Sequence, residues 1–252
     1  MSILLVDIGN TRVKWALLRG LHLGRMRALP HGGQRAALLS LVRAAPRDVA
    51  RVVAVCVAGT KLERALAAAV RARFGVACEF MRSERSAAGV RNGYRDTWRL
   101  GADRWVSVIG AHVTAGGRPA VIANIGTALT IDAVSGDGRH LGGAIAPGPG
   151  TMVQSLLAGT HGIRRRASGG AVRTRGLFAP DTASGLDAGA TYAAAAFIDR
   201  AFREAAAVMR GRPVLLLSGG AAPALRRYIK SPVRAVPDLV LRGLAVLAVA
   251  SA

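Results

Sequence analysis

The chain has 252 residues, 51% hydrophobic and 19% charged, so it is long enough for one large domain or two small ones with a sizeable core. This composition excludes a disordered chain, and no apolar run reaches the roughly 18 residues that a membrane span needs. The formal net charge is +21, but the arginines that supply it are spread along the whole chain. We therefore expect neither a membrane nor a nucleic acid as partner.

The N-terminus and the cysteines indicate the compartment. The first apolar run follows no basic region and breaks at Asp7, so no secretory signal is predicted. Cys56 and Cys78 are too far apart for a CxxC site. We expect reduced thiols and a cytoplasmic protein.

The chain begins with a predicted strand, a polar turn and a returning strand. The apolar run 3–6 ends in Asp7-Ile8-Gly9-Asn10-Thr11, and apolar residues resume over 13–17. Gly9 allows close approach of a ligand to the backbone, Asn10 and Thr11 can donate hydrogen bonds, and Asp7 can hold a hydrated Mg²⁺ beside a phosphate. Alone, the pattern is also typical of an ordinary hairpin turn.

The rest of the first half predicts further strands at 24–29, 51–57 and 76–81, with helices at 34–44 and 61–74. A polar loop over 82–100 precedes a helix that runs to about residue 113. Asp103 and Arg104 lie in its first turn, where the helix dipole favours a carboxylate. Glycines at 116 and 117, then Pro119, predict a boundary between domains of 1–117 and 118–252.

The second half repeats the strand–turn–strand pattern. A strand over 119–123 ends in Asn124-Ile125-Gly126-Thr127-Ala128, and strands at 129–134 and 140–145 follow. The pattern recurs about 117 residues after the first turn, and internal similarity at this spacing indicates duplicated domains. The two turns could face each other across a cleft and hold a nucleotide's phosphates. Further along, the sequence predicts a helix at 152–157, a Gly- and Arg-rich loop at 159–177 and a long helix at 182–209. A strand at 213–217, a short helix at 223–229 and a last helix from 238 follow.

Five motifs in order resemble the type III pantothenate kinases of bacteria, members of the acetate/sugar kinase–Hsp70–actin superfamily. They are 6–11, Tyr94 with 100–105, 126–132, 142–148 and 217–220. The resemblance implies an α/β fold of two ribonuclease-H-like (actin-like ATPase) domains, with mixed sheets flanked by helices and an ATP cleft between them. It implies ATP-dependent phosphorylation of pantothenate to 4′-phosphopantothenate, the first step of coenzyme A biosynthesis, by a homodimer.

The resemblance also implies residue roles. Asp103 would be the general base on the pantothenate hydroxyl, and Asp7 would handle Mg²⁺. Thr182 would reach the pantothenate that is bound by the partner subunit. The first phosphate loop would contain Asp7, Gly9, Asn10 and Thr11, and the second Gly126 and Thr127. The adenosine motif would be Ser218, Gly219 and Gly220, and the pantothenate pocket would include Tyr94, Gly101, Ala102, Asp103 and Arg104.

Some of these residues also have a purely structural interpretation, and the sequence differs from the family pattern at two positions. Asp103 and Arg104 could be an exposed ion pair at a helix start, and Tyr94 a loop aromatic that covers the core. Asp132 could be a strand-end carboxylate near the metal or a turn former. Asn124 stands where many family members have an Asp associated with a monovalent cation, K⁺ or NH₄⁺, so dependence on such a cation is in doubt. Asp181 stands where the family often has Asn, which could alter the subunit contact.

Other signatures are absent from the sequence. There is neither a GxxxxGK[ST] P-loop nor a GxGxxG after a strand, and the five histidines lack metal-ligand spacing, so we expect them to be structural or exposed. Cys56 is expected in the core. Two other hypotheses remain: a regulatory or nucleic-acid-binding protein on the same fold, and a kinase of another small hydroxy acid.

Overall fold

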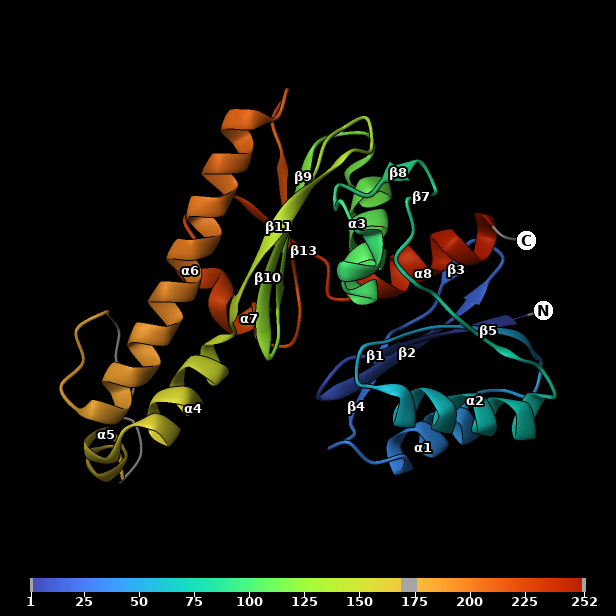
Figure 1. Ribbon diagram of the computed structural model, residues 1–252, viewed down its shortest axis with the longest axis horizontal. Coiled ribbons are helices and arrows are strands. Elements are labelled where there is room, and N and C mark those ends of the chain that lie inside the picture. The colour runs from blue at the N-terminus through green and yellow to red at the C-terminus, as the bar shows by residue number, and fades with distance from the viewer. Residues whose placement is uncertain (1, 169–175, 251–252) are drawn as a thin grey trace. The chain divides into compact units, whose positions relative to one another are not determined.

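The computed structural model describes residues 2–168 and 176–250, and the chain forms two compact units (Figure 1). The first unit comprises Met1–Gly117, Val134–Gly142 and Asp238–Ala252. The second comprises Arg118–Ala133 and Gly143–Pro237. Each unit contains a sheet flanked by helices, as the α/β prediction requires.

The first unit is built on a mixed sheet with the strand order β3-β2-β1-β5-β6, and β4 pairs with β2. β1 is central, because it pairs antiparallel with β2 and parallel with β5. The strands are β1 (Ser2–Ile8), β2 (Arg12–Arg19), β3 (His22–Leu23), β4 (Arg27–Pro30), β5 (Val49–Cys56) and β6 (Cys78–Phe80). The predicted strand–turn–strand at the N-terminus is confirmed.

Helices cover both faces of this sheet: α1 and α2 lie on one face, and α8, with α3 against it, on the other (Figure 1). Their bounds are α1 (Ala36–Ala44), α2 (Thr60–Phe74), α3 (Ala102–Ala115) and α8 (Leu239–Ala250). Alternate residues of β1 enter the two cores, Leu4 and Val6 toward α1 and α2, and Leu5 toward α8. Burial on both faces explains why β1 is a continuous apolar run in the sequence.

The last helix packs in the first unit, although we predicted that 118–252 forms the second domain. Val240, Leu241 and Leu244 of α8 share a core with Leu5 of β1. The α3–α8 contact is very close, since a Cβ built on Gly243 would lie 1.9 Å from the carbonyl oxygen of Val106.

The second unit contains a sheet with the order β11-β10-β9-β12-β13, in which β12 is parallel to both β9 and β13. The order repeats that of the first unit, with β9 in the place of β1, as the duplicated sequence pattern predicts. The strands are β9 (Ala120–Ile125), β10 (Ala128–Val134), β11 (His140–Pro147), β12 (Val214–Ser218) and β13 (Val233–Ala235). The helices are α4 (Pro149–Gly159), α5 (His161–Arg166), α6 (Thr182–Val208) and α7 (Ala222–Leu225).

The long helix α6 begins at a side-chain cap. Oδ1 of Asp181 accepts a hydrogen bond from the backbone N–H of Ser184 at 2.9 Å, which satisfies a free donor of the first helical turn. Asp181 therefore has a local structural role that explains a carboxylate here.

Smaller elements complete the chain. The short strands β7 (Ser86–Ala87) and β8 (Val90–Arg91) pair with each other, and two 3₁₀ turns occupy Thr97–Arg99 and Arg226–Tyr228. The predicted loop 159–177 is wrong where α5 forms, because arginine favours a helix. Residues 169–175 of that predicted loop lie outside the described residues.

Candidate active site

The first candidate loop follows the central strand of the first unit. Asp7 lies near the end of β1 with only 5% of its surface exposed, opposite Lys14 of β2. The Lys14 Nζ lies 3.8 Å from Asp7 Oδ2. Beyond Asp7, the Gly9 N–H donates to the Arg12 carbonyl at 3.1 Å and closes the hairpin. Asn10 and Thr11 form the exposed tip.

The Asp7 carboxylate is unusually easy to protonate. Burial raises its pKa from the ordinary 3.8 to about 6; Lys14 opposes this rise, and the negative charge of Asp103 adds to it. Two of the predicted site carboxylates therefore lie close enough within the first unit to repel each other. A cation beside them would relieve both the burial cost and the repulsion.

The donor set near Asp7 fits magnesium rather than a metal held by protein alone. Among the described residues, no group of three or more His, Cys, Asp or Glu side chains could hold a metal ion. Mg²⁺ commonly uses one or two carboxylates together with waters and substrate phosphates, so the buried Asp7 carboxylate beside the candidate phosphate loop fits it.

Asp103 and Arg104 stand at the start of α3. Asp103 is half-buried in the first turn, and its Oδ1 accepts the backbone N–H of Arg104 at 2.8 Å. The preceding Gly101 and Ala102 are also half-buried. A Cβ on Gly101 would lie 2.9 Å from Asp103 Oδ1, so any larger residue at position 101 would crowd the carboxylate.

Arg104 is oriented by aromatic neighbours. It is 5% exposed, and its Nη1 donates to the Tyr94 hydroxyl at 3.0 Å. The Tyr94 ring lies under the guanidinium, 5.7 Å from centroid to Cζ, and stacks on His140 at 5.9 Å between centroids. The exposed ion pair that we considered for Asp103–Arg104 is therefore wrong, because Arg104 is buried and bonds to Tyr94.

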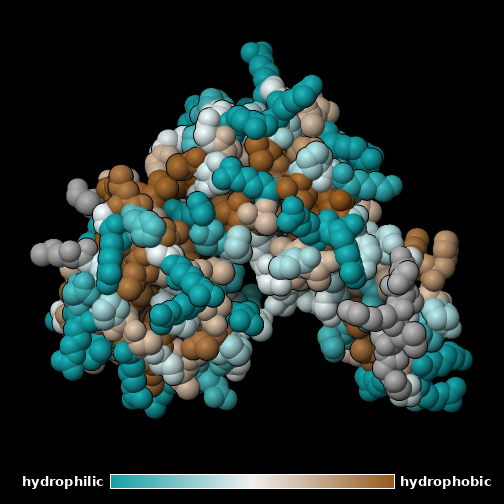
Figure 2. Space-filling view, turned by 180° about the vertical axis from the view of Figure 1, so that it is seen from behind, coloured by the Kyte–Doolittle hydropathy of each residue, from teal (hydrophilic) through white to brown (hydrophobic). Residues whose placement is uncertain are grey.

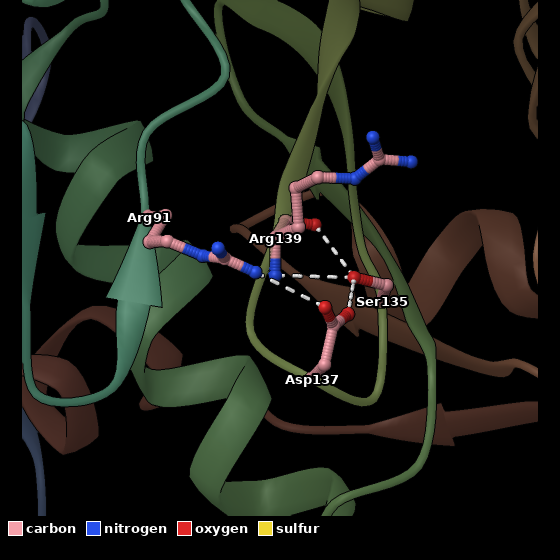
Figure 3. A network of polar contacts seen from close by, with 4 residues as sticks. All are labelled: Arg91, Ser135, Asp137 and Arg139. Carbon is pink, nitrogen blue, oxygen red and sulfur yellow. Dashed lines mark hydrogen bonds and ion pairs between the residues drawn. The ribbon is translucent and has the colours of Figure 1, made fainter.

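A strongly basic cavity of about 820 Å³ lies beside Tyr94 and His140. Four arginines contribute to its lining: Arg85, Arg91, Arg95 and Arg139. Arg91 pairs with Asp137 at 3.1 Å, and Asp137 is held by Ser135, whereas the Arg139 guanidinium points away from these three residues (Figure 3). This cavity suits an anionic ligand.

The second candidate loop follows β9 in the second unit. The Gly126 N–H donates to the Ala128 carbonyl at 2.9 Å, and the Thr127 carbonyl accepts from the Gly148 N–H at 2.9 Å and from Thr151 Oγ1 at 2.6 Å. A Cβ on Gly148 would lie 2.0 Å from the Gly126 carbonyl oxygen. The start of α4 thus holds this loop from behind.

The predicted adenosine motif lies next to this loop. Ser218 is in register with Asn124 across the β9–β12 pair. Gly219 has φ +95°, and a Cβ there would lie 2.3 Å from the carbonyl oxygen of Ile125, so only glycine fits this turn. Gly220 follows it and is exposed. The second unit therefore brings together Asn124, the loop and the adenosine motif.

Other predicted residues are placed separately. Thr182 is the half-buried first residue of α6. Asp132 lies on β10 with 1% of its surface exposed, so it is not a turn residue. Cys56 belongs to the core, where burial raises the pKa of its thiol, and burial raises the pKa of Cys78 to about 12. Neither cysteine is a ready nucleophile.

Two histidines near the site could not be recognised from the sequence. His140 is 1% exposed and stacks on Tyr94, and His31 is 5% exposed and contacts the carbonyl of Gly9. Each is isolated in the sequence, so only the fold connects it to a site residue.

Hydrophilic and hydrophobic residues alternate across the face seen in Figure 2. Within the described ranges, none of the helices is long and apolar enough to cross a membrane.

Comparison with known proteins identifies the family. The family model of type III pantothenate kinase matches residues 3–204. The type III pantothenate kinase of Aromatoleum aromaticum (strain DSM 19018 / LMG 30748 / EbN1) is 41% identical over 248 residues, which cover 98% of this chain and 97% of that protein.

Two solved structures share the fold. A putative Baf family transcriptional activator from Campylobacter jejuni has a TM-score of 0.61 at 19% identity, covering 96% of this chain and 94% of that one. A putative 2-dehydro-3-deoxygalactonokinase from Sinorhizobium meliloti has a TM-score of 0.59 at 13% identity and covers 98% of both chains. At these identities the structures support the actin-like fold alone, while the family match and the curated relative show that this chain belongs to the type III pantothenate kinase family.

Proposed function

We propose that Asp103 is the general base with which this chain transfers the γ-phosphoryl group of ATP to the hydroxyl of pantothenate. The reaction itself follows from the family: ATP-dependent phosphorylation of pantothenate to 4′-phosphopantothenate, the first step of coenzyme A biosynthesis. What supports the assignment of Asp103 is its geometry: a half-buried carboxylate in the first turn of α3, whose Oδ1 accepts the Arg104 N–H at 2.8 Å, in the same unit as Asp7, whose pKa its charge helps to raise.

Phosphoryl transfer depends on in-line positioning and charge neutralisation more than on covalent chemistry. Asp103 needs only to orient the primary hydroxyl of pantothenate and to accept its proton late in the transfer. Its position at the start of α3 suits this task, since the helix dipole and the Arg104 N–H keep the carboxylate in one orientation.

Arg104 would bind the carboxylate of pantothenate. A planar guanidinium matches a carboxylate with two parallel hydrogen bonds, and the contact with Tyr94 at 3.0 Å orients it before the substrate arrives. Tyr94, Gly101 and Ala102 would form the wall of this pocket.

The first phosphate loop would hold ATP together with magnesium. Asp7 would hold Mg²⁺ directly or through water, while Gly9, Asn10 and Thr11 contact the phosphates. When bound there, the metal would supply positive charge to the phosphate oxygens. Gly126 and Thr127 would contact the phosphates from the second unit, and Ser218, Gly219 and Gly220 would contact the adenosine.

Further parts of the proposal come from the sequence and from its comparison with the family. They are a homodimer to which each subunit contributes Thr182, a cytoplasmic location, and activity that depends little on K⁺ or NH₄⁺ because Asn124 lacks a carboxylate. The nucleic-acid-binding alternative is not favoured, because the curated relative is a kinase by name.

The variant Asp103→Asn tests the proposed base. It keeps the shape of the side chain and the acceptor oxygen for the Arg104 N–H but cannot take a proton. We expect turnover to fall by about 10²- to 10⁴-fold, while the unfolding midpoint and nucleotide binding stay at the wild-type values. Near-normal turnover by a folded variant would exclude Asp103 as the base.

A further inference from the structure

His31 contacts the first phosphate loop from the segment between β4 and α1. Its Nε2 lies 2.7 Å from the carbonyl oxygen of Gly9, and its backbone N–H donates to the carbonyl of Thr11 at 3.1 Å. The side chain is buried, and its Nδ1 accepts the N–H of Gly33 at 3.0 Å. One residue thus contacts two of the loop's carbonyl groups.

These contacts fix the position of the ring proton. Since Nδ1 accepts a hydrogen bond from Gly33, the neutral imidazole carries its hydrogen on Nε2. The His31 Nε2–H therefore donates to the Gly9 carbonyl. An amide hydrogen bond of this kind holds the peptide unit between Gly9 and Asn10 in one orientation.

The orientation of that peptide determines where its N–H points. In a trans peptide the C=O and the N–H point in opposite directions, and the chain has no cis peptide bond among the described residues. Holding the Gly9 carbonyl toward His31 therefore directs the Asn10 N–H away from His31. Glycine at position 9 would otherwise allow this peptide to rotate, because it restricts the backbone least.

We propose that His31 is a positioning residue for nucleotide binding: its Nε2–H holds the Gly9 carbonyl so that the Asn10 N–H stays aimed at a phosphate of ATP. The inference rests on the proposed role of the loop 7–11 as the first phosphate loop. His31 does not itself touch ATP in this account.

Two substitutions separate the two hydrogen bonds of the ring. The amide nitrogen of Gln in His31→Gln stands as many bonds from the backbone as Nε2, so it can keep the bond to Gly9. The amide oxygen of Asn in His31→Asn stands where Nδ1 does, so it keeps the bond to Gly33 and loses the one to Gly9. His22→Asn, on the exposed His22, is the matched control.

The measurement is the Kd of a non-hydrolysable ATP analogue with Mg²⁺, together with the KM values for ATP and pantothenate. We expect His31→Asn to weaken analogue binding and raise the KM for ATP by about tenfold, the usual effect of one lost hydrogen bond, with the KM for pantothenate unchanged. His31→Gln and His22→Asn should stay within about threefold of wild type.

Two results would overturn the proposal: wild-type affinity in His31→Asn, or equal losses in the Asn and Gln variants. If His31→Asn does not fold, His31→Gln decides alone, with retained affinity supporting the proposal and lost affinity overturning it. Binding of the analogue is read without catalysis, so a wild-type protein that binds ATP but leaves pantothenate unmodified would refute the proposed function and still test His31.

Discussion

Replacing Asp7 with asparagine is expected to stabilise the protein in the absence of metal and nucleotide while it removes activity. Asp7 is 5% exposed and lies near Asp103, so its negative charge is costly in the folded state. Asparagine has the shape of the protonated acid and carries no charge. The variant should therefore gain the stability that the wild type loses on ionising Asp7.

The magnitude follows from the shifted pKa. The rise from 3.8 to about 6 corresponds to about 3 kcal/mol, at about 1.4 kcal/mol for each pKa unit. Between these two pH values the folded state binds more protons than the unfolded state, so wild-type stability falls as the pH rises through this window. The advantage of Asp7→Asn should be small near pH 4 and reach its full size of about 3 kcal/mol above pH 7.

The assay is urea unfolding of both proteins at several pH values from 4.5 to 8, without Mg²⁺ or ATP. The matched control is Asp137→Asn, because the Ser135 hydrogen bond lowers the pKa of Asp137, and removing this carboxylate should give no gain at high pH. A stability difference that does not change with pH, or an Asp7→Asn protein less stable than wild type at pH 8, would refute the reasoning.

Three further predictions concern other parts of the molecule. Arg104→Lys should raise the KM for pantothenate by about tenfold with little effect on the KM for ATP, because lysine cannot form the paired hydrogen bonds of a guanidinium; equal changes in both KM values would contradict this. Gly243→Ala should lower the free energy of unfolding by about 1–3 kcal/mol or more in urea titrations, since the new Cβ would lie 1.9 Å from a carbonyl oxygen of α3. Gly189→Ala, which has open space around its Cβ, should not destabilise the protein. Adding K⁺ at constant ionic strength should change turnover less than about twofold, because Asn124 offers no charge to the cation; a steep requirement would show that another group binds it.

The sequence predicts the loop-bearing strands well because their signals are local. The run around Leu4 is apolar without interruption since both faces of β1 are buried, and it stops at the polar turn that follows Asp7. The stripe of Leu62, Leu66 and Val70 similarly predicts α2, whose buried face holds these three residues. The identity and order of the five motifs also sufficed for the resemblance to the family.

The relations between distant residues could not be predicted. Nothing near Gly243 in the sequence indicates that α8 packs against α3 in the first unit, because this contact depends on a glycine in each helix. The helix α5 was also missed, since Gly162 and the arginines around it are common in loops as well as in helices. His31 is a single residue 22 positions from Gly9, and only the folded hairpin brings the two together.

The most direct test of the account is the identity of the reaction product. Purified protein would be incubated with ATP, Mg²⁺ and either pantothenate or a panel of other small hydroxy acids, and the products would be identified by mass spectrometry. The account predicts 4′-phosphopantothenate with wild type and little with Asp103→Asn. Phosphorylation of a different hydroxy acid in preference to pantothenate, or no phosphopantothenate from a folded protein that binds ATP, would contradict it.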